Sequence, residues 1–292
     1  MKTAFVILNY NTPESTINLV NEISDFVNLN AIIVVDNHST DDSAERLKLL
    51  KDNNKVKLIL APKNGGYSYG NNIGMRECTK QNVDIAFIAN PDISIKEKDF
   101  DLIRASLIDS DYSLLQGVQY QPDGSVGDVP VQFLYTYWDY IRDCFYIGRR
   151  IRDLREPKCI DYNKPIQPMT MFRGSCFAIK VKDFERVGGF DEHVFLFCEE
   201  TILSHKLLEA HLKIGLSTGA RYLHIGSESI RAIFNKNASR MCLLYKSIYY
   251  YNLRYNKIGI VKKIILKLSI GVSTIEFYVK DCISEGFRRI RK

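Results

Sequence analysis

The sequence predicts an α/β fold in which a mostly parallel sheet is flanked by helices and followed by a basic helical appendage. Three observations support this prediction. Short apolar runs alternate with segments of helical spacing through the first hundred residues, each run ends in polar residues, and positive charge gathers toward the C-terminal end. Strands that alternate with helices form right-handed crossovers, which produce a parallel sheet covered on both faces.

The elements follow from local composition. Runs rich in Val, Ile, Leu and Phe predict strands, and spacings of three and four residues between apolar positions predict helices. The strands are expected over 3–8, 31–36, 56–60, 84–89, 113–120 and 174–179, with a strand-like run at 219–223. The helices are expected near 15–28, 43–52 and 69–80, and from Leu203 toward Gly215.

Composition excludes several classes of protein. The chain has 292 residues, 46% hydrophobic and 25% charged, which are ordinary values for a globular protein. Its seven cysteines are scattered and form no Cys-x-x-Cys pair, so neither a disulfide framework nor a zinc cluster is expected, and a cytoplasmic protein is indicated. The apolar run at 3–8 is too short for a signal-peptide core, and we expect no secretion signal.

The charge is distributed unevenly. The chain carries +6, yet residues 240–292 contain twelve Lys or Arg and three acids, so residues 1–239 carry a net −3. Lys262, Lys263, Lys267 and Glu276 interrupt the apolar stretch 258–279, which therefore should not span a bilayer. Two interpretations remain open: an amphipathic surface facing an anionic membrane, or a helical bundle packed on the rest of the chain or on a twin subunit in a homodimer. Nucleic-acid binding is not expected, because no recognition motif accompanies the charge.

Polar residues follow each of the first four strands. They are Asn9 after the first strand, Asp36 at the end of the second, an Asn-Gly-Gly loop at 64–66 after the third, and Asn-Pro-Asp at 90–92 after the fourth. The carboxyl ends of parallel strands form one edge of a sheet, where ligands collect, so these positions suit a nucleotide. For Asp36 and Asp92 the alternative is an ordinary turn. The loop at 64–66 matches neither G-x-G-x-x-G nor the P-loop motif.

A second group of residues lies toward the C-terminal side. Glu199 and Glu200 follow the apolar and aromatic run 195–198, which is expected to draw the pair toward the interior. Burial raises the pKa of a carboxyl group, and a raised pKa suits a general base. The alternative is that the two glutamates are solvated in the first turn of a helix. His224 follows the strand-like run. Residues 126–168 are expected to form a variable or mobile region such as a lid. Its aromatic cluster at 133–140 could stack on a sugar, although core packing is favoured.

Six stretches in register then suggest a family. They lie at 6–11, 34–41, 64–74, 90–92 and 188–200, and at His224, and together they span about residues 3–230. In these stretches the chain resembles the family 2 glycosyltransferases with the GT-A (Rossmann-like) fold, especially their bacterial rhamnosyltransferase-like branch. The resemblance implies a catalytic domain over 1–235, with a nucleotide-binding half at about 1–98 and an acceptor half at about 99–235, and a basic amphipathic helical region over 236–292.

The resemblance also implies roles for individual residues. Glu200 is expected to be the catalytic base, with Glu199 orienting the acceptor or the base. Asp92 and His224 are expected to bind a divalent metal, Mn²⁺ or Mg²⁺, on the diphosphate of the donor. Binding of the nucleotide-sugar donor is assigned to Asn9, Asn11, Asp36, Asn64, Gly66, Asn71, Asn72 and Asn90.

The implied function is an inverting, metal-dependent glycosyltransferase. The donor is expected to be dTDP-rhamnose or a UDP-hexose, and the acceptor a polysaccharide or lipid-linked saccharide at the inner face of the cell membrane. Asn90 replaces the first acid of the usual Asp-x-Asp, and Ile202 and Lys206 also depart from the family pattern. These departures motivate an alternative, a non-catalytic nucleotide-sugar-binding subunit or scaffold of a polysaccharide synthase. A sugar nucleotidyltransferase is disfavoured, since the chain lacks a basic Gly-rich loop near its N-terminus.

Overall fold

The structure is a computed structural model and describes residues 1–126, 133–151, 159–226 and 237–290. The chain divides into two compact units. The first comprises Met1–Leu134, Pro157–Phe195 and Glu199–Ser229, and the second comprises Tyr135–Glu156, Leu196–Cys198 and Ile230–Lys292. The domain boundary predicted between residues 235 and 236 lies outside the described residues.

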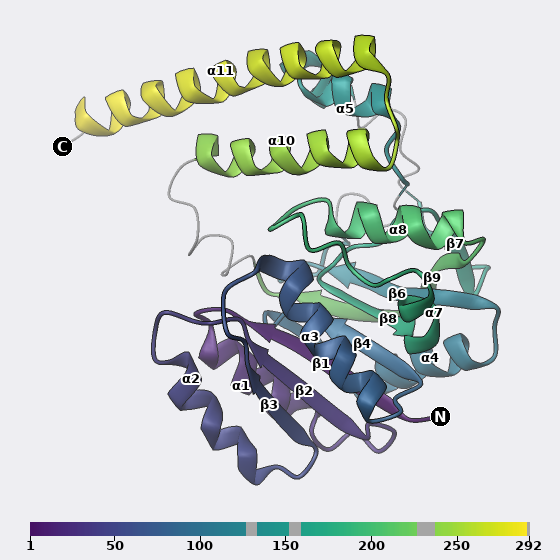
Figure 1. Cartoon of the computed structure of the whole chain (residues 1–292). Helices are drawn as coiled ribbons and strands as arrows, with labels where there is room; N and C mark the ends of the chain where they lie inside the picture. Colours follow the sequence, from purple (N-terminus) through teal and green to yellow (C-terminus); the bar gives the residue numbers. More distant parts are fainter. Residues whose placement is uncertain (127–132, 152–158, 227–236, 291–292) are drawn as a thin grey trace. The chain divides into compact units, whose positions relative to one another are not determined.

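The first unit is built on one sheet, shown in Figure 1. The strand order is β3-β2-β1-β4-β8-β6-β9-β5, and β7 also pairs with β9. The strands described are β1 (Thr3–Asn9), β2 (Ala31–Asp36), β3 (Val56–Leu60), β4 (Ile85–Ala89), β5 (Ile93–Ile95), β6 (Tyr112–Tyr120), β7 (Ile166–Met169), β8 (Cys176–Lys180) and β9 (Lys213–His224).

The α/β fold class is confirmed, and the sheet is mixed. β1 to β4 pair in parallel, as do β6 and β9, whereas β8 runs antiparallel to both β4 and β6. β5 and β7 run antiparallel to β9. Asn9 is level with Asp36 in the pairing of β1 with β2, so the polar ends of these two strands lie side by side.

Helices cover both faces of this sheet and bury two apolar clusters. One cluster joins β-strand residues to helices α3 (Gly66–Lys80), α7 (Val181–Arg186) and α8 (Glu199–Glu209). The other joins them to α1 (Pro13–Ile23), the 3₁₀ helix η1 (Leu47–Asp52) that continues α2 (Ser43–Arg46), and α4 (Glu97–Ile108). Successive side chains of β1 alternate between the two clusters, as the period of a strand buried on both faces requires.

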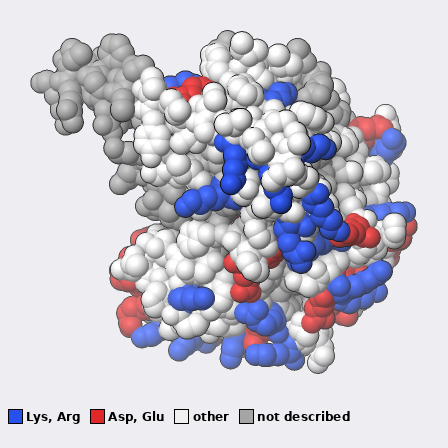
Figure 2. Space-filling model, turned by 45° about the horizontal axis from the view of Figure 1, so that its top comes forward, with Lys and Arg blue, Asp and Glu red and all other residues white. Residues whose placement is uncertain are grey.

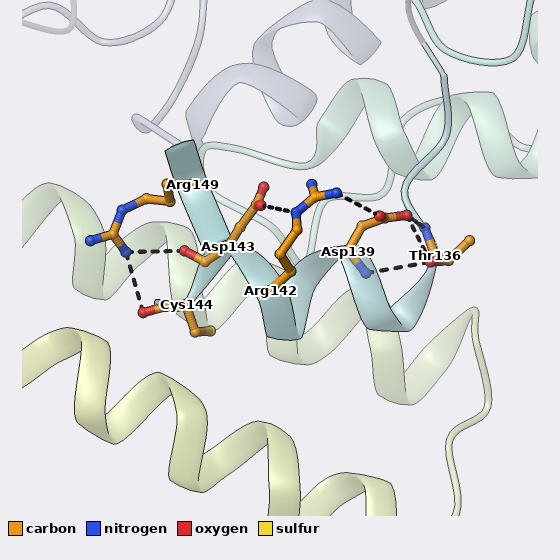
Figure 3. A network of polar contacts seen from close by, with 6 residues as sticks. All are labelled: Thr136, Asp139, Arg142, Asp143, Cys144 and Arg149. Carbon is orange, nitrogen blue, oxygen red and sulfur yellow. Dashed lines mark hydrogen bonds and ion pairs between the residues drawn. The ribbon is translucent and has the colours of Figure 1, made fainter. Parts of the chain in front are cut away.

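The second unit is helical in its described part. It contains α5 (Tyr137–Asp143), α6 (Tyr146–Ile151), α10 (Asn237–Arg254) and α11 (Ile260–Ile290). A capping box between Thr136 and Asp139 starts α5, because each side chain accepts a hydrogen bond from the other's backbone N–H. Arg142 then pairs with Asp139 and Asp143, as Figure 3 shows.

The region expected to form a lid at 126–168 is only partly described, since 127–132 and 152–158 lie outside the described residues. The rest of it contributes α5, α6 and the start of β7. Its aromatic cluster is divided: Tyr137 and Tyr140 are buried, as core packing predicts, whereas Phe133 and Trp138 are exposed. Among the described residues, no helix combines the length and the apolar character that crossing a bilayer requires.

Candidate active site

The carboxyl ends of β1 and β2 form a buried hydrogen-bonded cluster. Asn9 is completely buried, and its Nδ2 donates to Asp36 Oδ1 at 2.8 Å and to Ser39 Oγ at 3.1 Å. Its Oδ1 accepts from the hydroxyls of Thr12 and Thr16. The side chain of Asn9 is therefore fully used within the protein, and it holds the Asp36 carboxylate at the sheet edge.

The Asn-Gly-Gly loop is fixed to this edge through Asn37. The Nδ2 of Asn37 donates to Asn64 Oδ1 at 3.0 Å and to Gly66 O at 3.1 Å, and Asn64 Oδ1 also accepts from the Gly66 N–H. Asn37 Oδ1 is buried and has no hydrogen-bond partner among the described residues, which marks it as an acceptor available to a ligand. Asn37 was not among the predicted site residues, although its position directly after Asp36 could have indicated it.

Gly66 connects this loop to the segment that precedes the two glutamates. It has φ +85°, and an added Cβ would lie 2.0 Å from the carbonyl oxygen of Phe195. The next residue, Tyr67, donates its backbone N–H to the same carbonyl at 3.0 Å. The close approach of the two backbones requires glycine at position 66.

The remaining asparagines have different surroundings. Asn11 exchanges hydrogen bonds with Thr40 and is partly exposed. Asn72 bonds both backbone groups of Phe190 and therefore holds the turn at 188–192. Asn71 is completely buried, and its Oδ1 has no partner among the described residues. Asn90 is partly exposed and donates its N–H to the Ser175 carbonyl at 2.8 Å.

Asp92 and His224 are brought together by strand pairing. Ile93 is opposite His224 in the β5–β9 ladder, and Ile225 N donates to Asp92 O at 2.8 Å. His224 Nε2 consequently lies 3.4 Å from Asp92 Oδ2. Asp92 Oδ1 is buried and has no hydrogen-bond partner in the described part of the chain.

This pair fits a divalent cation. A buried carboxylate oxygen without a partner, next to an imidazole nitrogen, is a donor set that Mn²⁺ accepts, and Mg²⁺ also takes carboxylate oxygen. No group of three or more His, Cys, Asp or Glu side chains suited to a metal occurs in the described ranges. Asp92 and His224 would thus supply two ligands, and substrate phosphates and water would supply the others.

A buried polar network supports His224 from behind. Gln119 Nε2 lies 3.4 Å from His224 Nδ1, and Gln119 Oε1 accepts from Ser175 Oγ at 3.2 Å and from Tyr222 Oη at 3.1 Å. Gln116 Nε2 donates to the same Tyr222 hydroxyl. The amide Nε2 of Gln119 can only donate, so its contact with His224 orients the ring but leaves Nδ1 unprotonated and the proton of the neutral imidazole on Nε2. For Nε2 to bind a metal, the Gln119 amide would have to turn so that its oxygen accepts from Nδ1–H. None of these four supporting residues was predicted as a site residue, because Gln116, Gln119 and Tyr222 lie on strands without a motif and Ser175 directly precedes one.

Glu199 and Glu200 begin α8, and both carboxyl groups have perturbed pKa values. Burial raises the pKa of Glu199 well above the ordinary value, and the neighbouring Glu200 charge raises it further. Burial also raises the pKa of Glu200, while backbone hydrogen bonds, including one from Gly174 N at 3.2 Å, oppose this shift. The surroundings therefore disfavour the charged form of Glu199 more strongly than that of Glu200.

Residues 174 and 175 connect the two halves of the site. Gly174 N donates to Glu200 Oε1, and Gly174 O accepts from the Tyr67 hydroxyl at 2.7 Å. Ser175 Oγ donates to Gln119, which contacts His224. A continuous series of contacts therefore runs from the expected base to the expected metal pair. Tyr67 remains protonated, since burial and the charges of the two glutamates raise its pKa.

A mixed α/β sheet of this type, with acidic and imidazole side chains at the carboxyl ends of its strands, defines a protein of the GT-A glycosyltransferase class. The model of the family "Glycosyl transferase family 2" matches residues 4–188, which is more than half of the chain. The chain therefore belongs to glycosyl transferase family 2.

Individual relatives agree with this assignment. The chain is 25% identical over 213 residues to the low-salt glycan biosynthesis hexosyltransferase Agl10 of Haloferax volcanii, a match that covers 73% of this chain and 63% of the relative. The chain thus spans less than two thirds of that relative's length. This relative is a hexosyltransferase by name, and the rhamnosyltransferase-like branch stays a prediction.

Solved structures share the fold at low sequence identity. GalNAc-T7 with UDP, GalNAc and Mn²⁺ has a TM-score of 0.61 and 13% identity, covering 92% of this chain and 54% of that chain. The mannosyltransferase PcManGT of Pyrobaculum calidifontis with GDP-Man and Mn²⁺ has a TM-score of 0.60 and 15% identity, covering 94% and 73%. TarS 1–349 of S. aureus with UDP-GlcNAc has a TM-score of 0.56 and 13% identity, covering 93% and 72%.

Proposed function

We propose that this chain is an inverting, metal-dependent hexosyltransferase that uses a nucleotide-sugar donor. The observation that carries the proposal is the series of contacts joining Glu200, through Gly174 and Ser175, to the Asp92–His224 pair. This series of contacts supports the proposal because a one-step sugar transfer uses both a base for the acceptor and a cation for the leaving diphosphate.

In this proposal each of the four side chains has its own role. Asp92 and His224 would hold Mn²⁺ or Mg²⁺, which when bound stabilises the negative charge of the leaving nucleoside diphosphate. Glu200 accepts the proton of the acceptor hydroxyl as that oxygen bonds to the anomeric carbon and the bond from this carbon to the diphosphate breaks. Because one displacement occurs, the configuration inverts. Glu199 keeps its proton and leaves Glu200 charged.

The donor is held at the ends of β1 to β4 in the same proposal. Asn11, Asn64 and Asn90 contact the nucleotide, and so do Asp36, Gly66 and Asn71. Asn9 and Asn72 act through the groups that they hold, namely the Asp36 carboxylate and the turn at 188–192. dTDP-rhamnose is the favoured donor and a UDP-hexose the alternative. The acceptor is a polysaccharide or lipid-linked saccharide at the inner face of the cell membrane, a location suited to the basic C-terminal region.

A panel of donors tests this proposal. The full chain is incubated with Mn²⁺ and dTDP-rhamnose, UDP-glucose, UDP-galactose or GDP-mannose, and donor binding is followed by thermal shift while sugar release is followed by chromatography. Glu200→Gln should bind the donor as tightly as the unchanged protein and lose turnover at least about a hundredfold. Glu209→Gln, an exposed glutamate of the same helix, should change neither.

Two results would contradict the proposal. A folded protein that binds none of the donors lacks the proposed site. A protein that binds a donor but never releases sugar, with or without Glu200, would instead support the alternative of a non-catalytic nucleotide-sugar-binding subunit. The replacement of the first acid by Asn90 favours that alternative, and so does the finding that no group of three or more candidate metal ligands occurs among the described residues.

A further inference from the structure

Helix α11 of the second unit has an apolar stripe that is largely exposed. Eight of its apolar side chains are each more than half exposed, which is unusual for residues of this kind on a single helix. At 100° per residue, all eight fall within an arc of about 120°. They are Ile260, Val261, Ile264, Leu268, Val272, Ile275, Tyr278 and Val279.

The opposite face of the same helix is already occupied. Leu266 and Ser273 are completely buried, and Ser273 bonds the hydroxyl of Tyr245 on α10. On a third side, Tyr137 of α5 donates its hydroxyl to Lys262 O at 3.0 Å, and Arg149 of α6 pairs with Glu276 at 2.6 Å. Packing within the unit therefore accounts for one face of α11 and leaves the apolar stripe largely exposed.

The charge around the stripe favours an anionic surface as its partner. Residues 257–292 contain nine Lys or Arg and three acids. Lys263 and Lys267 flank one edge of the stripe at helical spacing. On the face that Figure 2 shows, Lys and Arg lie among Asp, Glu and uncharged residues. A second copy would bring two segments of net positive charge together, which disfavours a homodimer through this face.

We propose that the apolar stripe of α11 seats in the surface of an anionic lipid bilayer, with the helix lying in the plane of the interface. Apolar side chains on one arc, basic side chains beside them, and a helix that does not meet the requirements for spanning are the features of an interfacial helix. This inference does not depend on the proposed transferase activity, since vesicle binding needs neither donor nor acceptor.

Vesicle sedimentation of the full chain tests the inference. The protein should sediment with vesicles containing 30% phosphatidylglycerol, and weakly with pure phosphatidylcholine, to a degree that salt reduces. The double variant Leu268→Glu with Ile275→Glu should bind at least about tenfold less. Val27→Glu with Leu49→Glu, at two exposed apolar positions of the first unit, is the matched control and should bind as the unchanged protein does.

Separate variants test how much the basic side chains contribute to vesicle binding. Lys263→Gln and Lys267→Gln should each weaken binding to anionic vesicles by about fivefold. Equal binding to neutral and anionic vesicles would overturn the role of charge, and unchanged binding by the Leu268→Glu, Ile275→Glu variant would overturn the role of the stripe. A homodimer in light scattering that this double variant dissociates would show that the stripe binds a second copy instead. Circular dichroism establishes that each variant is folded.

Discussion

The contact between Gly66 and Phe195 allows a stability prediction with an internal control. Gly66 and Gly124 have nearly the same φ, +85° and +82°. An added Cβ at Gly124 meets nothing within 4 Å, whereas at Gly66 it would lie 2.0 Å from Phe195 O and 2.7 Å from Phe195 C. Alanine at either position thus requires a left-handed φ, and only at Gly66 does its Cβ also meet a neighbouring group.

The expected magnitudes follow from these contacts. A left-handed conformation costs a non-glycine residue about 1–2 kcal/mol, which is the whole effect expected for Gly124→Ala. Overpacking against a neighbouring group adds about 1–3 kcal/mol, so Gly66→Ala should lower the free energy of unfolding by about 2–5 kcal/mol. Because the clash is with a backbone carbonyl, no side-chain rotation can relieve it.

Thermal and urea unfolding, followed by circular dichroism, measure the two variants. Fluorescence of the single tryptophan, Trp138, is unsuitable because this residue belongs to the second unit, whereas both glycines belong to the first. Gly66→Ala should also weaken donor binding, since Gly66 bonds Asn37 and Asn64 at the expected donor site. Equal destabilisation by the two alanines would refute the reasoning, because the Phe195 contact would then contribute nothing.

Three further predictions concern the carboxyl pair and the histidine. Since the pKa of Glu200 is raised above 4.5, a pH–rate profile should show kcat/KM rising with pH along an acid limb centred above 4.5. An acid limb centred at or below 4.5 would contradict the role of Glu200 as the base. The pKa of Glu199 is also raised in the folded state, so its protonated form stabilises the protein below pH 4.5, and this contribution is lost as the pH rises through the raised value. In urea unfolding, Glu199→Gln should therefore become more stable than the unchanged protein as the pH increases. A difference in stability that stays constant with pH would argue against a buried acid. Gln119→Leu removes the side chain that contacts the His224 ring and should weaken Mn²⁺ binding about 10–100-fold, as measured by electron paramagnetic resonance. Gln116→Leu disturbs the same network without touching that ring, so it should leave the Mn²⁺ affinity unchanged. Equal effects of the two variants would exclude a positioning role for Gln119.

The first half of the sheet could be predicted from the sequence because its signals are local. Each of β1 to β4 is a short apolar run that ends in polar residues, so alternation with helices was enough to predict the parallel arrangement. β5, which covers Ile93–Ile95, was missed because three residues give no periodic pattern. Its position is determined by pairing with β9, more than a hundred residues later in the chain.

The candidate site also contains some residues that could be predicted from the sequence and others that could not. Asp92 and His224 were predicted together only through the resemblance to a family, and the structure does bring them within 3.4 Å. Gln119 and Tyr222 could not be predicted, since on their strands they resemble ordinary buried polar residues, and their importance depends on which side chains meet across β6, β8 and β9. The roles of these residues in binding and catalysis stay predictions.

The contact between Gly174 and Glu200 follows from the antiparallel direction of β8. It lies just before β8, the strand that reverses direction between β4 and β6, so the residues entering this strand reach the carboxyl end of β4. An added Cβ at Gly174 would lie 2.6 Å from Glu200 Oε1, which means that glycine is required for the carboxylate to approach the backbone N–H. That N–H favours the charged form of Glu200, while burial opposes it. The antiparallel strand thus supplies what a purely parallel sheet would lack: a backbone donor that offsets part of the cost of burying the charged form of Glu200.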